Sequence, residues 1–193
     1  MNIFTKKVFD KKAQKRESPL LFQKGLSLIE ASMVLALSAI VVSGVMYYYQ
    51  AASDNNKTQS TVSEVMSIVS AVNGLYVGTS GYTGLTEKVI MNTSAIPENY
   101  KDGQSIIHPF GGKINIGATK DKTKYYIILN DVPQGACVNL ASMNFGTSLA
   151  GADVGDNVKT TAEAGQLISD ALTPAEASTR CNKDTNKIAF LLK

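Results

Sequence analysis

The sequence predicts an α+β protein with a long N-terminal α-helical spine, membrane-spanning in its first half, packed on an antiparallel β-sheet head with a disulfide-closed C-terminal region. Three observations lead to this prediction. An apolar run covers Leu26 to Tyr49, and an amphipathic helical pattern continues it to Tyr76. Short runs typical of strands follow, and both cysteines lie between the last two of these runs.

The first 25 residues form a basic leader. Its cations are Lys6, Lys7, Lys11, Lys12, Lys15, Arg16 and Lys24, against Asp10 and Glu17, so its net charge is 7 minus 2, or +5. The whole chain carries +3 (19 minus 16), which leaves 12 minus 14, or −2, for the remainder. The positive-inside rule places the leader in the cytoplasm and the rest outside. A nearly neutral remainder disfavours nucleic-acid binding and suits a subunit that packs against its own copies.

The apolar run has the length of a membrane span. Leu26 to Tyr49 contains no Pro, Asp, Lys or Arg, and a helix of that length reaches about 36 Å at about 1.5 Å per residue. It exceeds the apolar core of a signal peptide, although Ala51 and Ala52 offer an alternative cleavage site downstream. Glu30 is the single charge in the run. Such a charge costs roughly 2.5 to 3.5 kcal/mol in hydrocarbon, which predicts a partner for it.

The helical pattern changes after Tyr49. Apolar residues recur at helical spacing, while polar residues fill the other positions, so a single helix is predicted from about Leu26 to about Tyr76. The apolar set is Val62, Val65, Met66, Val69, Val72 and Tyr76, and the polar set is Asp54, Lys57, Gln59, Ser63 and Glu64. A single-pass anchor followed by a separate helix is the alternative. Gly44 is a weak point, because Gly costs about 1 kcal/mol against Ala inside a helix.

The chain from Val77 onward has the size of one domain. Val77 to Gly112 is rich in Gly and predicts an irregular connection with a short helical turn near Thr86 to Met91. Three strands are predicted, over Lys113 to Gly117, Tyr125 to Asn130 and Lys187 to Leu192. Between the first two, Lys120, Lys122 and Lys124 are interpreted as a solvated hairpin turn.

Cys137 and Cys181 are the only cysteines, and both fall on the exported side. Two cysteines in an oxidising compartment predict one disulfide. A zinc or redox role is disfavoured because there is no CxxC motif. Thr173, Pro174 and Glu176 have the spacing of a capping box, which predicts a short helix that ends near Arg180.

No catalytic constellation is present in the sequence, so an enzyme is not expected. His108 is interpreted as a loop histidine, since no hydrolase, metalloprotease or P-loop motif accompanies it. The stretch from Gly151 to Asn157 is faintly similar to a calcium loop but lacks the ligand spacing and the closing Glu. Neither a metal nor a cofactor is therefore expected.

The N-terminal signal resembles that of a known family. A basic leader that ends in Gly25, then Leu26 and a Glu at the fifth position of a long apolar helix, resembles the processing and assembly signal of type IV pilins. The 25-residue leader and Leu26, where the other subclass usually has Phe, are similar to the type IVb group. Several later stretches, among them GVMYYYQAASDNNK, SEVMSIVSAVNGLYVG and LTPAEASTRC, also resemble pilins of this group.

This resemblance implies a function and a division of the chain. A prepilin peptidase would cut between Gly25 and Leu26 and methylate the new amine of Leu26, and Glu30 would serve assembly. Residues 1–25 would be the removed leader, 26–76 the membrane anchor and filament core, and 77–193 the pilin head. The precursor would lie in the inner membrane of a Gram-negative bacterium. Assembly machinery would then polymerise it into a helical homopolymer, a surface pilus for adhesion and bacterial aggregation, with contacts to host cells or between pili.

Two alternatives to a major pilin remain at this point. A minor pilin or a type II secretion pseudopilin shares the N-terminal signal. A signal-anchored extracytoplasmic binding domain would need a ligand-binding set, which the sequence does not display.

Overall fold

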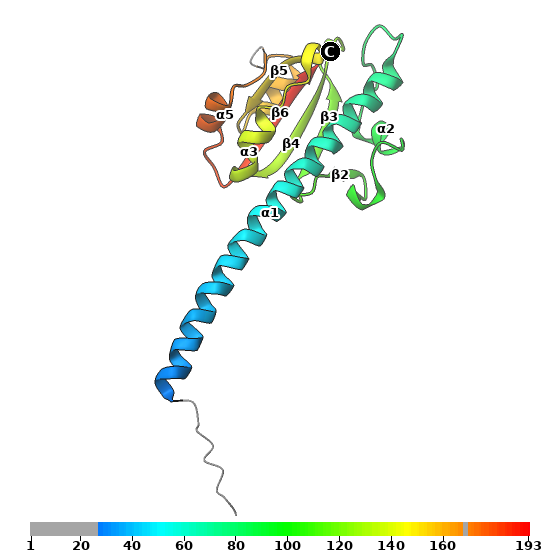
Figure 1. Cartoon of the computed structure of the whole chain (residues 1–193). Helices are drawn as coiled ribbons and strands as arrows, with labels where there is room; N and C mark the ends of the chain where they lie inside the picture. Colours follow the sequence, from blue (N-terminus) through cyan, green and yellow to red (C-terminus); the bar gives the residue numbers. More distant parts are fainter. Residues whose placement is uncertain (1–26, 168–169) are drawn as a thin grey trace, which may run out of the picture. The chain divides into compact units, whose positions relative to one another are not determined.

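The computed structural model describes residues 27–167 and 170–193. The predicted cleavage and methylation site, at Gly25 and Leu26, lies outside these residues. The structure divides into two compact units at Gly44, and the helix α1 (Leu28–Tyr76) runs through this boundary without a break (Figure 1). The prediction of one helix to Tyr76 is confirmed, and the alternative of two separate helices is wrong.

The second unit, Val45–Lys193, is built on a six-stranded antiparallel sheet with the order β1-β2-β3-β4-β6-β5. Its strands are β1 (Lys101–Asp102), β2 (Ser105–Ile107), β3 (Lys113–Ala118), β4 (Tyr125–Pro133), β5 (Leu149–Val154) and β6 (Thr185–Leu192). The three predicted strands are confirmed as β3, β4 and β6. The sequence analysis did not identify β1, β2 and β5.

The C-terminal strand β6 is central, since it pairs with β4 on one side and β5 on the other. Ile188, Phe190 and Leu192 belong to the larger apolar core, whereas Ala189 and Leu191 belong to a smaller cluster. Because successive side chains of a strand point to opposite faces, both faces of the sheet are covered at β6. This explains the continuous apolar run of β6.

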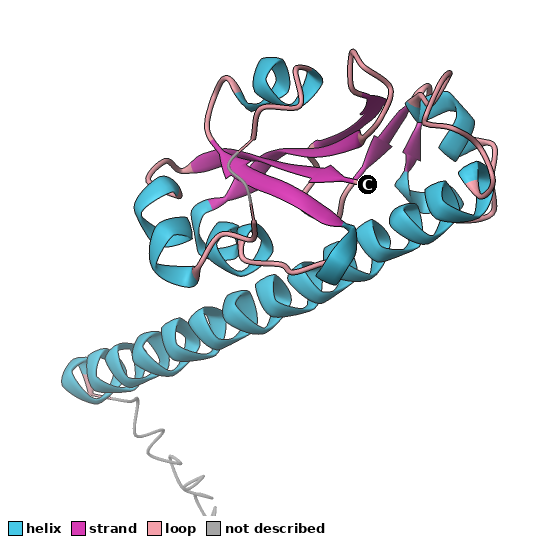
Figure 2. Cartoon of the chain, turned by 90° about the horizontal axis from the view of Figure 1, so that it is seen from above, coloured by secondary structure: helices cyan, strands magenta, loops and turns pink. Residues whose placement is uncertain are grey.

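Helices lie on both faces of the sheet (Figure 2). The larger core joins the Val45–Tyr76 part of α1 to the sheet and to α2 (Glu87–Met91), α3 (Gln134–Ala141) and α5 (Pro174–Arg180). The smaller cluster places α4 (Val158–Glu163) against β4 and β6. Two short 3₁₀ helices, η1 (Glu98–Tyr100) and η2 (Gly146–Ser148), complete the elements. The predicted α+β fold is confirmed.

The buried face of α1 differs from the predicted one at two positions. Its buried residues are Thr61, Glu64, Val65, Ile68, Val69 and Val72. Met66 was expected on this face but is 44% exposed, and Glu64 was expected on the polar face but is buried. The reason is that the connection from α2 to η1 covers the flank of the helix on which Glu64 lies, with Ala95, Pro97 and Tyr100 beside it.

Candidate assembly surface and its supporting head

Glu30 lies in the first turn of α1, at the start of the described chain. One of its carboxylate oxygens accepts a hydrogen bond of 3.0 Å from the backbone N–H of Ser27. The first four N–H groups of a helix have no partner within the helix, and a negative charge there is favourable to the helix dipole. The sequence therefore places the one charge of the run where the helix itself stabilises it. The other carboxylate oxygen has no partner within the described chain.

The surface that follows Glu30 is apolar and exposed. From Leu28 to Tyr49 every side chain is exposed except that of Ala31, which is half-buried. The large apolar residues of this surface are Leu28, Ile29, Met33, Val34, Leu35, Leu37, Ile40, Val41, Val42, Val45 and Met46. Soluble proteins rarely expose an apolar surface of this extent, so it marks a site that a membrane or a partner covers. The helix α1 is the one described helix whose length and composition could span a membrane.

The polar side chains within this surface are satisfied by the helix itself. The hydroxyls of Ser32, Ser38 and Ser43 donate to the carbonyls of Ile29, Val34 and Ala39, over 2.7 to 2.8 Å. Unsatisfied polar groups are costly in hydrocarbon, and these three serines present none. Glu30 is thus the one group of this stretch whose charge calls for a partner from outside.

Three exposed tyrosines end the apolar surface. Tyr47, Tyr48 and Tyr49 are 73 to 78% exposed. Tyrosine is enriched where a membrane meets water, because its ring is apolar and its hydroxyl is polar. Their position marks the end of the surface that suits hydrocarbon. This tyrosine cluster was not predicted from the sequence, where Tyr49 served only as the end of the apolar run.

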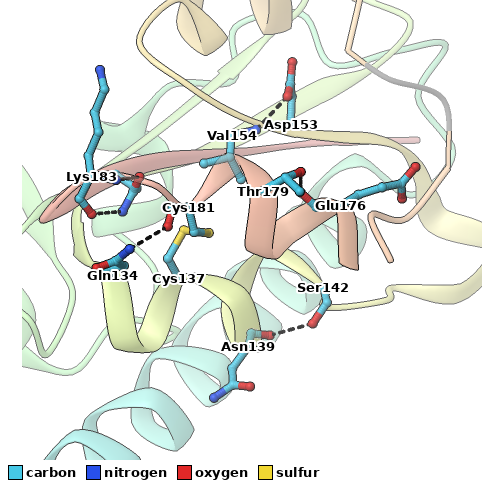
Figure 3. Close-up of a disulfide and its surroundings, with 11 residues drawn as sticks. Gln134, Cys137, Asn139, Ser142, Asp153, Val154, Glu176, Thr179, Cys181 and Lys183 are labelled. Carbon is cyan, nitrogen blue, oxygen red and sulfur yellow. Dashed lines mark hydrogen bonds between the residues drawn. A yellow bond between two sulfur atoms is a disulfide. The ribbon is translucent and has the colours of Figure 1, made fainter. Parts of the chain in front are cut away.

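The two cysteines form the predicted disulfide, which joins α3 to the end of α5. Their Cα atoms lie 5.9 Å apart, and both residues are buried. The side-chain amide of Gln134 donates to the carbonyl of Cys181 over 3.1 Å (Figure 3). The predicted capping box is also present, since Thr173 and Glu176 exchange hydrogen bonds at the start of α5. The bridge and the cap together hold a region that is poor in large apolar residues.

His108 is a loop histidine, as predicted, since it lies in the connection between β2 and β3, and its side chain is buried. Its Nε2–H donates to the carbonyl of Asn130 over 2.6 Å, and its Nδ1 accepts from the backbone N–H of Phe110 over 3.3 Å. Burial lowers the pKa of His108, which the bond to Asn130 opposes in part. Both ring nitrogens are engaged, so the ring fastens the β2–β3 connection to β4.

The remaining sequence candidates have structural explanations. The lysine-rich segment is the β3–β4 turn, as predicted, where Thr119 and Thr123 donate to Asp121 and lower the pKa of its carboxyl to about 2. The stretch from Gly151 to Asn157, which the sequence disfavours as a calcium loop, begins within β5, and its Asp153 pairs with Arg180 of α5. Among the described residues no group of three potential metal ligands is found.

The fold and this surface define the class of protein. The crystal structure of TcpA, a type IV pilin from Vibrio cholerae El Tor biotype, matches 72% of this chain and 99% of its own with a TM-score of 0.51. The two share 11% sequence identity, so this match shows the fold alone. The fold is that of a type IV pilin.

The family follows from sequence. The bundlin family model matches residues 50–193. Two proteins described as the major structural subunit of bundle-forming pilus are 50% and 48% identical, from Escherichia coli O127:H6 and O111:H− respectively. Each match covers 89% of this chain and 95% of the relative. The chain belongs to the bundlin family of structural pilus subunits, which confirms the predicted resemblance to type IVb pilins.

Proposed function

We propose that this chain is the precursor of the major subunit of a type IVb pilus. A prepilin peptidase cuts it between Gly25 and Leu26 and methylates the new amine. The subunit waits in the inner membrane through the first half of α1, and the pilus assembly machinery transfers it into a helical homopolymer on the cell surface. The filaments serve adhesion and bacterial aggregation.

The observation that carries this proposal is the single charge at the start of an exposed apolar helix. A surface like that of Leu28 to Tyr49 is compatible with lipid before assembly and with copies of the same helix after it. Glu30 is the only group in this surface that distinguishes the lipid bilayer from the assembled filament. Lipid offers no fixed cation for the carboxylate, whereas a neighbouring subunit does.

The cation in this scheme is the α-amine that cleavage creates at Leu26. A free α-amine has a reference pKa of about 7.7 to 8.0, so it is mostly cationic near neutral pH. In the filament core the amine of one subunit pairs with Glu30 of its neighbour, and each charge offsets the burial of the other. The pairing fixes the axial register between subunits.

The relatives' description as major subunits favours this role over that of a minor pilin or a pseudopilin. The share of this chain in the sheared filament protein distinguishes a major subunit from a minor one. A major subunit makes up nearly all of the sheared protein, whereas a minor subunit is a trace component.

The proposal is tested by Glu30→Gln, with Ser32→Ala as a matched control on the same exposed stretch. The glutamine keeps the shape and hydrogen-bonding capacity of Glu30 but removes its charge, so membrane insertion should be as good or better. Loss of one member of a buried ion pair typically costs about 3 to 5 kcal/mol, so filaments should be few or absent. Ser32→Ala removes only a bond to the helix's own backbone, so it should assemble normally.

The measurement compares the pilin in the membrane fraction with the pilin in the sheared surface fraction. The expected result for Glu30→Gln is subunit confined to the membrane, cleaved wholly or in part. Normal piliation with the neutral residue would refute the role of Glu30 in assembly.

A further inference from the structure

Glu64 is a buried carboxylate without a partner. The residue is 4% exposed, and neither of its carboxylate oxygens has a hydrogen-bond partner within the described chain. A buried polar side chain is normally bonded, and an unpaired buried charge is far more costly than an unpaired neutral group. Within a folded subunit this position is therefore unsatisfied.

Glu64 is one of the residues that line a hollow of about 220 Å³ between α1 and the connection that precedes β1. The helix side of this hollow consists of Ser60, Ser63 and Ser67, and the other side of Ala95, Pro97 and Tyr100. A second hollow, of about 460 Å³, shares Ser67 and Ala95 with the first and continues along α1 to Leu75. We call the two together the Glu64 groove. Its walls are mostly small side chains, so it has room for a slender side chain.

Three charged residues of α1, the connection and β1 are engaged with other groups of the subunit. Glu98 and Lys101, from the connection and β1, form an ion pair of 2.6 Å with each other. The ammonium of Lys57, on α1, lies 5.8 Å from the centre of the Phe110 ring. Burial alone raises the pKa of the Glu64 carboxyl, to about 8, and no charged neighbour opposes it. A cation from outside the subunit would reverse this effect and satisfy the carboxylate.

We propose that the Glu64 groove receives a lysine side chain of a second copy of this chain, whose ammonium pairs with Glu64. From Ser27 onward the chain has eleven lysines and one arginine, and that arginine, Arg180, is held by Asp153. Apart from the α-amine of Leu26, which the proposed function pairs with Glu30, lysine is therefore the cation that a neighbouring copy has to offer. Its thin aliphatic stem suits a groove with small side chains. A groove on one face that takes a side chain from a different face makes a head-to-tail contact, which repeats along a filament.

This inference rests on the proposed function, because a polymer supplies the second copy. It adds a second contact between subunits, on the head side of α1 and separate from Glu30. The Glu64 contact can be disproved while the proposed function stands, since filaments composed of this chain can exist without that contact.

The test is carbodiimide crosslinking of intact sheared filaments, because this reagent joins a carboxylate directly to an amine that touches it. Crosslinked dimers are separated on a denaturing gel and digested, and the joined peptides are identified by mass spectrometry. The neighbouring pair Glu98 and Lys101 lies within one subunit and is the internal control for the reaction. The expected result is a Glu64–lysine peptide in the dimer band.

Two variants sharpen the test. Glu64→Gln should lose this peptide and weaken the dimer band several-fold, while Glu98→Gln should lose only the internal link. If Glu64→Gln does not assemble, the wild-type dimer peptide alone decides. The proposal is overturned if the internal link forms but Glu64 is unreacted, if Glu64 joins a lysine only in the monomer band, or if it joins an amine of another protein.

Discussion

Cys137 of α3 and Cys181 at the end of α5 are joined across 44 positions of sequence, with their Cα atoms 5.9 Å apart. The segment that they enclose contains β5, α4 and α5, and much of it consists of Gly, Ala, Ser and Thr. Small side chains bury little apolar area, so the bridge replaces packing that this sequence cannot supply. The disulfide thus ties the segment that contains β5 to α3 and to the end of α5.

We predict that Cys137→Ser or Cys181→Ser destabilises the head and leaves processing intact. Closing a loop of this length stabilises by about 4 kcal/mol on the chain-entropy estimate. Limited proteolysis and the steady-state pilin level should both show the loss, with the cleaved form still present. Equal levels and equal protease resistance in the serine variants would contradict a structural role for the bridge.

We predict that Gly112→Ala is strongly destabilising. A Cβ at Gly112 would overlap the carbonyl oxygen of Asn130 and lie 2.5 Å from Nε2 of His108. Overpacking of this kind costs about 1 to 3 kcal/mol, and here it also displaces a buried hydrogen bond. Gly135→Ala in α3 is the matched control, because its Cβ meets no atom within 4 Å. Denaturant unfolding of the detergent-solubilised chain measures both, and an unchanged midpoint for Gly112→Ala would contradict the packing described.

We predict that Glu64 makes the unassembled subunit less stable at alkaline pH. Burial raises the pKa of the Glu64 carboxyl from its ordinary value of 4.5 to about 8 in the folded subunit. Its contribution is therefore full below about pH 4.5 and is lost as the pH rises through 8. At 1.36 kcal/mol per unit of pKa shift, discounted for screening by solvent, the loss of stability is roughly 2 to 3 kcal/mol. Burial lowers the pKa of His108, so its effect on stability has the opposite pH dependence. Its contribution to the free energy of unfolding falls as the pH drops below about 6.5.

The difference between wild type and Glu64→Gln isolates this effect, because all other groups titrate alike in both. Unfolding free energies measured from pH 5 to pH 9 should fall more steeply for wild type than for the variant. Parallel curves would show that Glu64 is solvated or paired within the subunit.

We predict that Gly25→Val leaves full-length precursor in the membrane. A side chain at the residue before the cut crowds a site that resembles one built for glycine. Immunoblots of the membrane and sheared fractions should show one band of precursor size and no surface protein. Normal cleavage of this variant would contradict the assignment of the processing site to Gly25.

Much of the fold was predictable because its longest elements have strong patterns. The α1 run, β3, β4 and β6 carry apolar periodicity or a β-branched apolar run, and Cys137 and Cys181 have only each other to pair with. The capping box at Thr173 was predictable because the spacing of Thr173 and Glu176 directly sets the hydrogen bonds that begin a helix. These are local sequence patterns, and the structure contains the elements that they predict.

The parts that sequence reasoning missed depend on tertiary contacts. The strand β5, with the sequence LAGADV, has little intrinsic strand propensity and forms because β6 offers it an edge. The burial of Glu64 depends on which flank of α1 the connection before β1 covers, and helical periodicity does not contain that information. The central place of β6 in the sheet is likewise a property of topology.

The most direct test of the account is the N-terminal residue and intact mass of the dominant protein in filaments sheared from cells. The account predicts a chain that begins at Leu26, carries a methyl group on its α-amine and makes up nearly all of the filament. A surface protein that begins at Met1, or after Ala52, would contradict the central claim that α1 becomes the filament core.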